Sequence, residues 1–112
     1  MRKIEQDCDG PLEIAGTALV SANIRGDVLI SEGASARVTG EIVGTVTVRK
    51  TGALVLVGRV KGAVINEGGA VDIFGFVGRV SDTGDTETWA SAGAIIGGQR
   101  VKAPSKLSKL SV

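Results

Sequence analysis

The chain has 112 residues, a formal net charge of +1, one cysteine and no histidine. This length predicts one domain, and the near-neutral charge gives no bulk attraction to nucleic acid. A single cysteine, Cys8, excludes an intrachain disulfide and is typical of a reducing compartment, so we expect a cytoplasmic protein. Arg2 and Lys3 near the start are not followed by an apolar run, so we expect no signal peptide.

Residues 1–11 are interpreted as an N-terminal segment or cap. The segment ends at Gly10-Pro11, and proline cannot donate the next hydrogen bond of a strand ladder. Ile4 is the apolar residue that we expect to cover the first coil of the fold that follows.

From residue 12 an aliphatic residue or alanine falls on every sixth position for nine steps. These positions are Leu12, Ala18, Ile24, Ile30, Ala36, Ile42, Val48, Leu54 and Val60. A helix repeats every ~3.6 residues, whereas a six-residue beat is typical of a β-solenoid in which three short strands make one coil. The sequence therefore predicts an all-β fold: a short single-stranded β-helix (β-solenoid) of about four triangular coils of ~18 residues, spanning residues 12–82.

Side chains in these strands should alternate between the core and the solvent. Placing Ile24 in the core puts Arg25 outside, and Glu41 and Arg59, one coil apart, should then form a charge pair. We expect the recurring glycines, such as Gly58 and Gly75, to bend the chain at coil corners, often with positive φ. The step between these two glycines is 17 residues, which indicates that one residue has been lost near Asn66.

Several outward positions are apolar. They are Leu19, Val43, Val55, Val57, Ile65 and Phe74. Scattered exposed aliphatics are common, but a contiguous patch of Val55, Val57 and Phe74 would mark a lateral contact surface. We also expect the terminal coils, near residues 12–24 and 71–80, to carry contacts, because open strand edges pair readily; Ile73 is the residue singled out there.

The repeat fades after residue 82. Residues 83–99 are interpreted as a polar link and a cap around Trp89, with Trp89, Ile95 and Ile96 forming a lid over the last coil. The alternative is that Trp89 anchors a partner, since tryptophan is enriched in interface hot spots; Asp82, Asp85 and Glu87 are then candidate partner-binding residues.

Residues 100–112 are basic and contain no acid, and we expect a flexible tail. Its basic residues are Arg100, Lys102, Lys106 and Lys109. Contact with an acidic partner or a membrane surface is expected only through this tail.

Residue types for catalysis are missing. The solenoid acyltransferases with hexapeptide repeats depend on a histidine base, and solenoid carbonic anhydrases bind their metal through histidine, whereas this chain has none. The glycine pairs also lack the lysine of a phosphate-binding loop. We therefore expect no enzymatic activity, no cofactor and no metal site.

The repeat resembles the bactofilins, a family of polymer-forming bacterial cytoskeletal proteins. The residues that carry the resemblance are 24–30 (IRGDVLI), 42–48 (IVGTVTV) and 52–62 (GALVLVGRVKG), and it extends over about residues 12–80. The resemblance implies a right-handed β-helix that assembles into filaments without nucleotide, in the cytoplasm and often next to the membrane.

Two functions are consistent with these features. The first is a bactofilin-like structural protein that assembles with itself through its coil ends and apolar lateral faces. The second is a capped, non-polymerising binding module, such as an immunity protein or antitoxin that blocks a toxin enzyme. The expected partner is thus a second copy of the chain or another protein, and not nucleic acid.

Overall fold

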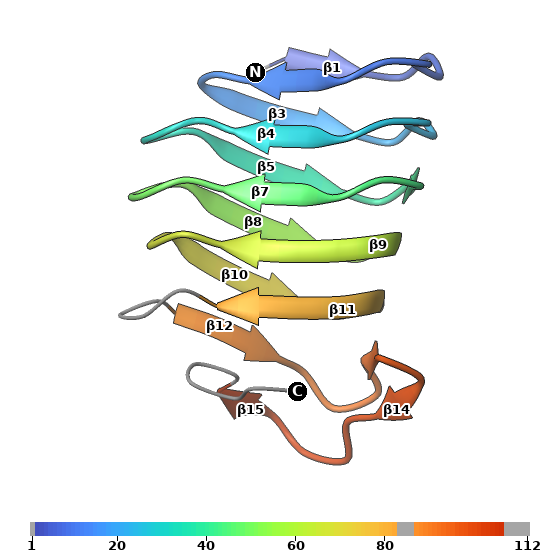
Figure 1. Ribbon diagram of the computed structural model, residues 1–112, viewed down its shortest axis with the longest axis vertical. Helices are drawn as coiled ribbons and strands as arrows, with labels where there is room; N and C mark the ends of the chain where they lie inside the picture. The colour runs from blue at the N-terminus through green and yellow to red at the C-terminus, as the bar shows by residue number, and fades with distance from the viewer. Residues whose placement is uncertain (1, 83–86, 107–112) are drawn as a thin grey trace.

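The computed structural model describes residues 2–82 and 87–106, in which fifteen short β-strands occur and no helix (Figure 1). The chain winds in successive turns that stack along its long axis. The N-terminal strand lies at one end of the stack and the last strands lie at the other. The predicted all-β solenoid is therefore confirmed.

The strands form two sheets. Sheet A has the order β1-β3-β5-β8-β10-β12-β15, with β1 (Arg2–Ile4), β3 (Thr17–Val20), β5 (Ser35–Val38), β8 (Ala53–Leu56), β10 (Ala70–Ile73), β12 (Glu87–Ala90) and β15 (Ser105–Lys106). Sheet B has the order β2-β4-β7-β9-β11-β13-β14, with β2 (Leu12–Ile14), β4 (Val28–Ile30), β7 (Val46–Val48), β9 (Arg59–Asn66), β11 (Phe76–Asp82), β13 (Ile95–Ile96) and β14 (Gln99–Arg100). A further strand, β6 (Glu41–Ile42), pairs with the start of β9.

Each turn has three sides. Sheet A forms one side. Strands β2, β4 and β7, together with the second halves of β9 and β11, form another. The third side is shorter: Cys8, Ile24 and Ile42 are joined by parallel bridges, and β6 continues this ladder into β9 and then β11. Because β9 pairs with both β6 and β7, it turns the corner between these two sides.

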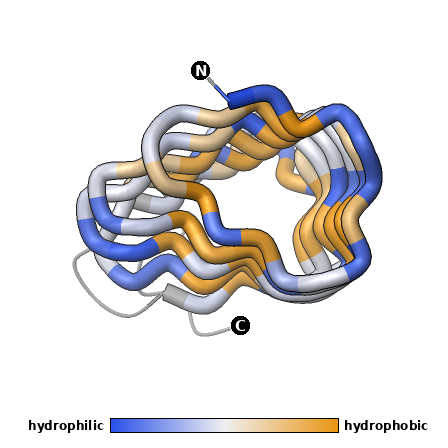
Figure 2. Tube along the Cα trace, turned by 90° about the horizontal axis from the view of Figure 1, so that it is seen from above, coloured by the Kyte–Doolittle hydropathy of each residue, from blue (hydrophilic) through white to orange (hydrophobic). Residues whose placement is uncertain are grey.

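The core is a set of aliphatic columns that run along the stack. One column in sheet A consists of Val20, Val38, Leu56, Ile73 and Ala90, and all of these side chains are buried. Viewed along the stack, the turns superpose and segments of like hydropathy lie over one another (Figure 2). The alternation predicted at Ile24 and Arg25 is confirmed, since Ile24 is buried and Arg25 is exposed. It continues along the chain, where Val28 and Ile30 are buried and Asp27 is exposed.

The solenoid extends further at both ends than the sequence suggested. Ile4 of β1 pairs with Val20 and is buried, so the N-terminal segment adds a rung of sheet A. β12 and β13 continue sheets A and B in parallel register, which gives about five turns in place of about four. The coil near 71–80 is consequently internal, whereas β2, at the start of the coil near 12–24, remains the N-terminal edge of sheet B.

The corner glycines Gly58 and Gly75 are required for close packing between turns, and neither has the positive φ that we expected. A Cβ atom on Gly58 would lie 2.0 Å from the carbonyl oxygen of Gly40, and one on Gly75 would lie 1.9 Å from that of Gly58. Positive φ occurs instead at the corner that precedes sheet A, for example at Gly33 (74°) and at Thr51 (61°). Thr51 accepts a hydrogen bond at Oγ1 from the Gly33 amide of the previous turn.

The corner between β9 and β10 is one residue shorter than the corner above it, and the buried side chain of Asn66 fills this corner. Asn66 follows Val48 in a core column of sheet B and is fully buried. Its Oδ1 accepts from the amides of Gly68 (3.2 Å) and Gly69 (2.8 Å), and its Nδ2 donates to the Gly69 carbonyl (3.0 Å) and to Thr88 Oγ1 (2.8 Å). The side chain thus supplies hydrogen bonds that a shortened backbone could not make.

Candidate self-association surface

The outer face of sheet A carries three columns of side chains, one residue per turn. The first column, at the start of the strands, contains Thr17, Ser35, Ala53 and Ala70. The central column contains Leu19, Arg37, Val55, Asp72 and Trp89, which are in direct register from β3 to β12. The edge column lies just past the strand ends and contains Ser21, Thr39, Val57, Phe74 and Ser91. In the edge column each amide donates to a carbonyl of the previous turn, for example Phe74 N to Leu56 O at 2.8 Å, which holds the column in register.

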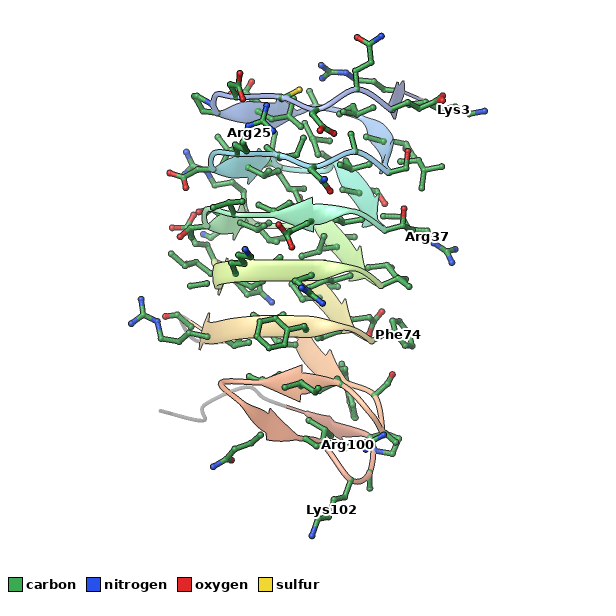
Figure 3. All side chains as sticks on the ribbon, turned by 90° about the vertical axis from the view of Figure 1, so that its right-hand side faces the viewer. Lys3, Arg25, Arg37, Phe74, Arg100 and Lys102 are labelled. Carbon is green, nitrogen blue, oxygen red and sulfur yellow. The ribbon has the colours of Figure 1, made fainter. Side chains whose placement is uncertain are left out.

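Apolar side chains gather where these columns cross the middle turns. Val57 is 42% exposed, Phe74 is 50% exposed and Trp89 is 42% exposed. Val55, two residues before Val57 in the same turn, is half-buried, and Asp72 separates it from Trp89 in the central column. These four apolar residues, here called the apolar patch, occupy three consecutive rungs. The structure thus brings together Val55, Val57 and Phe74 as the sequence predicted, on the side of the stack from which Arg37 and Phe74 project in Figure 3.

Ile73 does not lie on this surface. Its side chain is fully buried in the core column between Leu56 and Ala90, and only its neighbours Asp72 and Phe74 point outward. The expectation that Ile73 takes part in a contact is therefore corrected: the strand alternation places it inside.

The acidic candidates and the basic tail are only partly described. Asp82 ends β11 and Glu87 begins β12, but their side chains lie outside the described structure, as do Asp85, the Lys106 side chain and Lys109. Arg100 and Lys102 are exposed at the C-terminal end of the stack (Figure 3). Residues 100–106 do not form the expected free tail, because β14 and β15 pair with β13 and β12.

At the C-terminal end the last parallel turn is covered by reversed strands and not by a tryptophan lid. β14 runs antiparallel to β13, and β15 runs antiparallel to β12. Trp89 points outward from sheet A, while Ile96 and Val101 pack against the core and Ile95 is 37% exposed. The cap predicted around Trp89 is thus built from the segment that follows it.

A groove of about 530 Å³ follows the glycine corner beside the apolar patch. Its floor is the backbone of Gly40, Gly58 and Gly75, because no side chain fits there. Residues from successive turns line it, from Asn23 near the N-terminal end to Ile95 near the C-terminal end. Its shape suits an extended chain or a row of side chains more than a compact ligand.

The far wall of the groove is charged. Arg59 Nη1 lies 3.7 Å from Glu41 Oε2, which confirms the predicted pair, and Lys61 Nζ lies 3.8 Å from Glu41 Oε1. The Arg59 guanidinium also lies over the Phe76 ring, 5.8 Å from its centroid. These contacts join side chains of three successive turns, but because the groups are exposed they add little to the stability of the fold.

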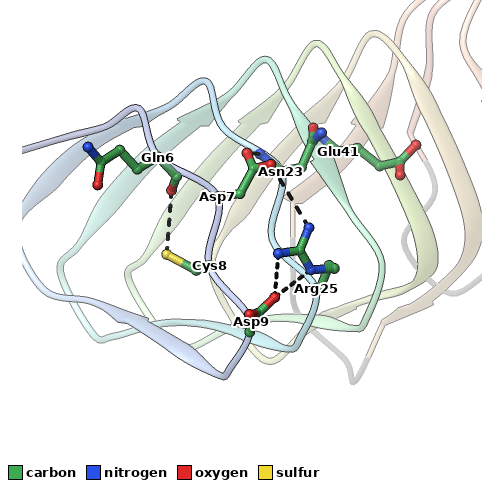
Figure 4. Close-up of polar contacts among 7 residues, drawn as sticks. All are labelled: Gln6, Asp7, Cys8, Asp9, Asn23, Arg25 and Glu41. Carbon is green, nitrogen blue, oxygen red and sulfur yellow. Dashed lines mark hydrogen bonds and ion pairs between the residues drawn. The ribbon is translucent and has the colours of Figure 1, made fainter.

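Charged groups also cover the N-terminal turn. Arg25 forms ion pairs with Asp9 and Asp7, and the Asn23 amide donates to Asp7 Oδ1 (Figure 4). The hydrogen bond and the charge of Asp9 raise the pKa of Arg25 above its ordinary value. Arg2 Nη1 donates to the outward carbonyl of Glu13 (3.2 Å) at the edge of β2.

Within residues 2–82 and 87–106, no three side chains of the types that ligate metals lie close enough together to hold an ion. No helix in this part of the chain is long and apolar enough to cross a membrane. Comparison with known proteins finds no matching family model, no matching curated protein and no matching solved structure. Functional inference consequently rests on the surface described above.

Sequence reasoning missed the two charges that flank Val55. Arg37 and Asp72 lie one turn to either side of it in the central column, and both are exposed. Counting 18 residues back and 17 residues forward from Val55 would have placed them there. Neither forms an ion pair with another described residue.

Proposed function

We propose that this chain is a structural protein that assembles with itself, in the manner of the bactofilins that its repeat resembles. The apolar patch is the observation that carries the proposal. Val57, Phe74 and Trp89 leave a large part of their apolar surface in water although the core has its own aliphatic columns. An exposed, contiguous apolar surface on a rigid face is typical of a site of protein contact.

The two ends of the stack differ in ways that bear on assembly. At the N-terminal end β1 and β2 have no described strand on their outer side, so their edges are available to another chain. At the C-terminal end the parallel stacking stops at β12 and β13, because the two-residue strands β15 and β14 pair with them in antiparallel orientation. Growth by lateral contacts, with pairing at the N-terminal edge, therefore fits this molecule better than continuous head-to-tail stacking. We place the assembly in the cytoplasm.

The antiparallel C-terminal end, which interrupts the parallel stacking, is also the observation that favours the second candidate, a non-polymerising module that binds another protein. Such a module, for example an immunity protein or antitoxin, would use the same apolar patch or the groove beside it. It would form no large assembly by itself, and this separates the two candidates.

Light scattering of a matched pair of variants tests the proposal. Phe74→Lys places a charge in the exposed patch, and we expect a folded protein with reduced self-association. Ile73→Lys places the same charge in the core, and we expect loss of the fold, which circular dichroism detects. Undiminished self-association of folded Phe74→Lys protein would remove the apolar patch from the proposal.

A further inference from the structure

Between β3 and β12 the central column of sheet A has the same order from either end once charge is exchanged; beyond these five rungs the column continues to Lys3 in β1 and Lys106 in β15. From β3 to β12 it runs apolar, positive, apolar, negative, apolar, through Leu19, Arg37, Val55, Asp72 and Trp89. Val55 of β8 is the midpoint, and the two charges lie one turn above it and one turn below it. A surface with this order is complementary to itself when it is turned end over end.

We propose that the outer face of sheet A binds the same face of a second copy, with a two-fold axis that runs along β8. This rests on the proposed self-association and names its partner surface. Rotation about this axis keeps the strand direction of the second copy but inverts the order of its turns. Each column of one copy therefore faces the same column of the other copy, with the turns in the opposite order. Arg37 of each copy then lies opposite Asp72 of the other, Val55 opposite Val55, and Leu19 opposite Trp89.

The edge column obeys the same symmetry. Its midpoint is Val57, in the same turn as Val55, so the two copies of Val57 face each other. Phe74 then lies opposite Thr39, whose side chain is smaller and leaves room for the ring. The outermost positions, Ser21 and Ser91, face each other as small polar residues at the rim, where polar groups are usual in interfaces.

The charge pattern excludes the other face-to-face arrangement. With the two-fold axis along the stack, each turn would face its own equivalent. Arg37 would then oppose Arg37 and Asp72 would oppose Asp72, and like charges placed together in an interface cost free energy. In the proposed arrangement both ion pairs are attractive, and neither charge has another described ion-pair partner within its own chain.

The face is small, so the dimer is expected to be weak. Five strands at ~4.8 Å spacing and four residues at ~3.3 Å each give a face of roughly 24 by 13 Å. This is well below the ~800 Å² per partner that standard interfaces bury. We expect a dissociation constant in the micromolar range or weaker, and measurements must reach high protein concentration.

Charge reversal tests the pairing directly by sedimentation equilibrium. Arg37→Asp sets two carboxylates opposite each other in each pair, and Asp72→Arg sets two guanidinium groups opposite each other. Each variant alone should therefore dimerise at least about tenfold more weakly than the wild type. An equimolar mixture of the two should dimerise again, because every opposing pair is then attractive. The double variant R37D/D72R should also recover, and Arg79→Asp, the same change on another side of the stack, should behave as the wild type does.

Each outcome decides the matter. Weaker dimerisation of each single variant, together with recovered dimerisation in the mixture, supports the pairing of Arg37 with Asp72. Single variants that associate as strongly as the wild type overturn this face while leaving self-association in place. A wild-type protein that stays monomeric throughout overturns both. Recovery in the mixture also shows that the single variants are folded.

Discussion

Replacing Gly58 with alanine should destabilise the protein by about 2–4 kcal/mol. The added Cβ would lie 2.0 Å from the Gly40 carbonyl oxygen, a contact that real Cβ atoms essentially never make, so the two turns must separate by about 1 Å. Three backbone hydrogen bonds cross this point: Val57 N to Val38 O (2.8 Å), Gly58 N to Val38 O (3.0 Å) and Arg59 N to Gly40 O (3.0 Å). Each contributes about 0.5–1.5 kcal/mol, and looser packing of the neighbouring core adds to the loss.

Gly10 provides a control from a different corner, the one that Gly26 and Gly44 also occupy, because it lies in the first turn and no turn lies above it. A Cβ atom there meets nothing within 4 Å, so Gly10→Ala should be neutral or should stabilise by up to about 1 kcal/mol through the unfolded chain. Gly26, where the Cβ would lie 2.7 Å from the Gly10 carbonyl oxygen, should fall between the two. Urea unfolding followed by circular dichroism gives the three values. Equal stability of the Gly58 and Gly10 variants would refute the close stacking of turns at the corner of Gly40, Gly58 and Gly75.

Three further substitutions address the core and the surface. Val46→Asp buries a charge at a fully buried site and should abolish folding, whereas Thr47→Asp, next to it and partly exposed, should remain folded; circular dichroism distinguishes them. Asn66→Ala leaves the amides of the shortened corner without an acceptor and should cost about 2–3 kcal/mol in urea unfolding. Glu41→Gln weakens two exposed ion pairs and should change stability by less than about 1 kcal/mol, a difference that vanishes in high salt.

The sequence period predicted correctly those parts of the fold in which every turn has the same length and the same alternation of buried and exposed residues. The six-residue beat and strand alternation placed Ile24, Ile42 and Val60 in the core, and the 18-residue step paired Glu41 with Arg59. These predictions succeed because parallel stacking forces equivalent residues of adjacent turns to lie over one another. The same rule brought Val57 and Phe74 together on the surface.

The rest failed where the repeat is irregular. The polar stretch after residue 82 concealed a further turn, since β12 resumes the register only after an interruption in the pattern. Ile73 was assigned to the surface because its coil was thought to be terminal, although its own alternation places it inside. The role of Gly58 depends on the distance between turns, which no single-sequence pattern contains.

Sedimentation velocity of the wild-type protein over a wide range of concentration, with negative-stain electron microscopy of the same samples, tests the central claim most directly. The account predicts a mass that rises with concentration, and particles built from stacks joined side by side. A single sharp monomer boundary at every concentration and every salt condition, with no assemblies on the grid, would contradict it.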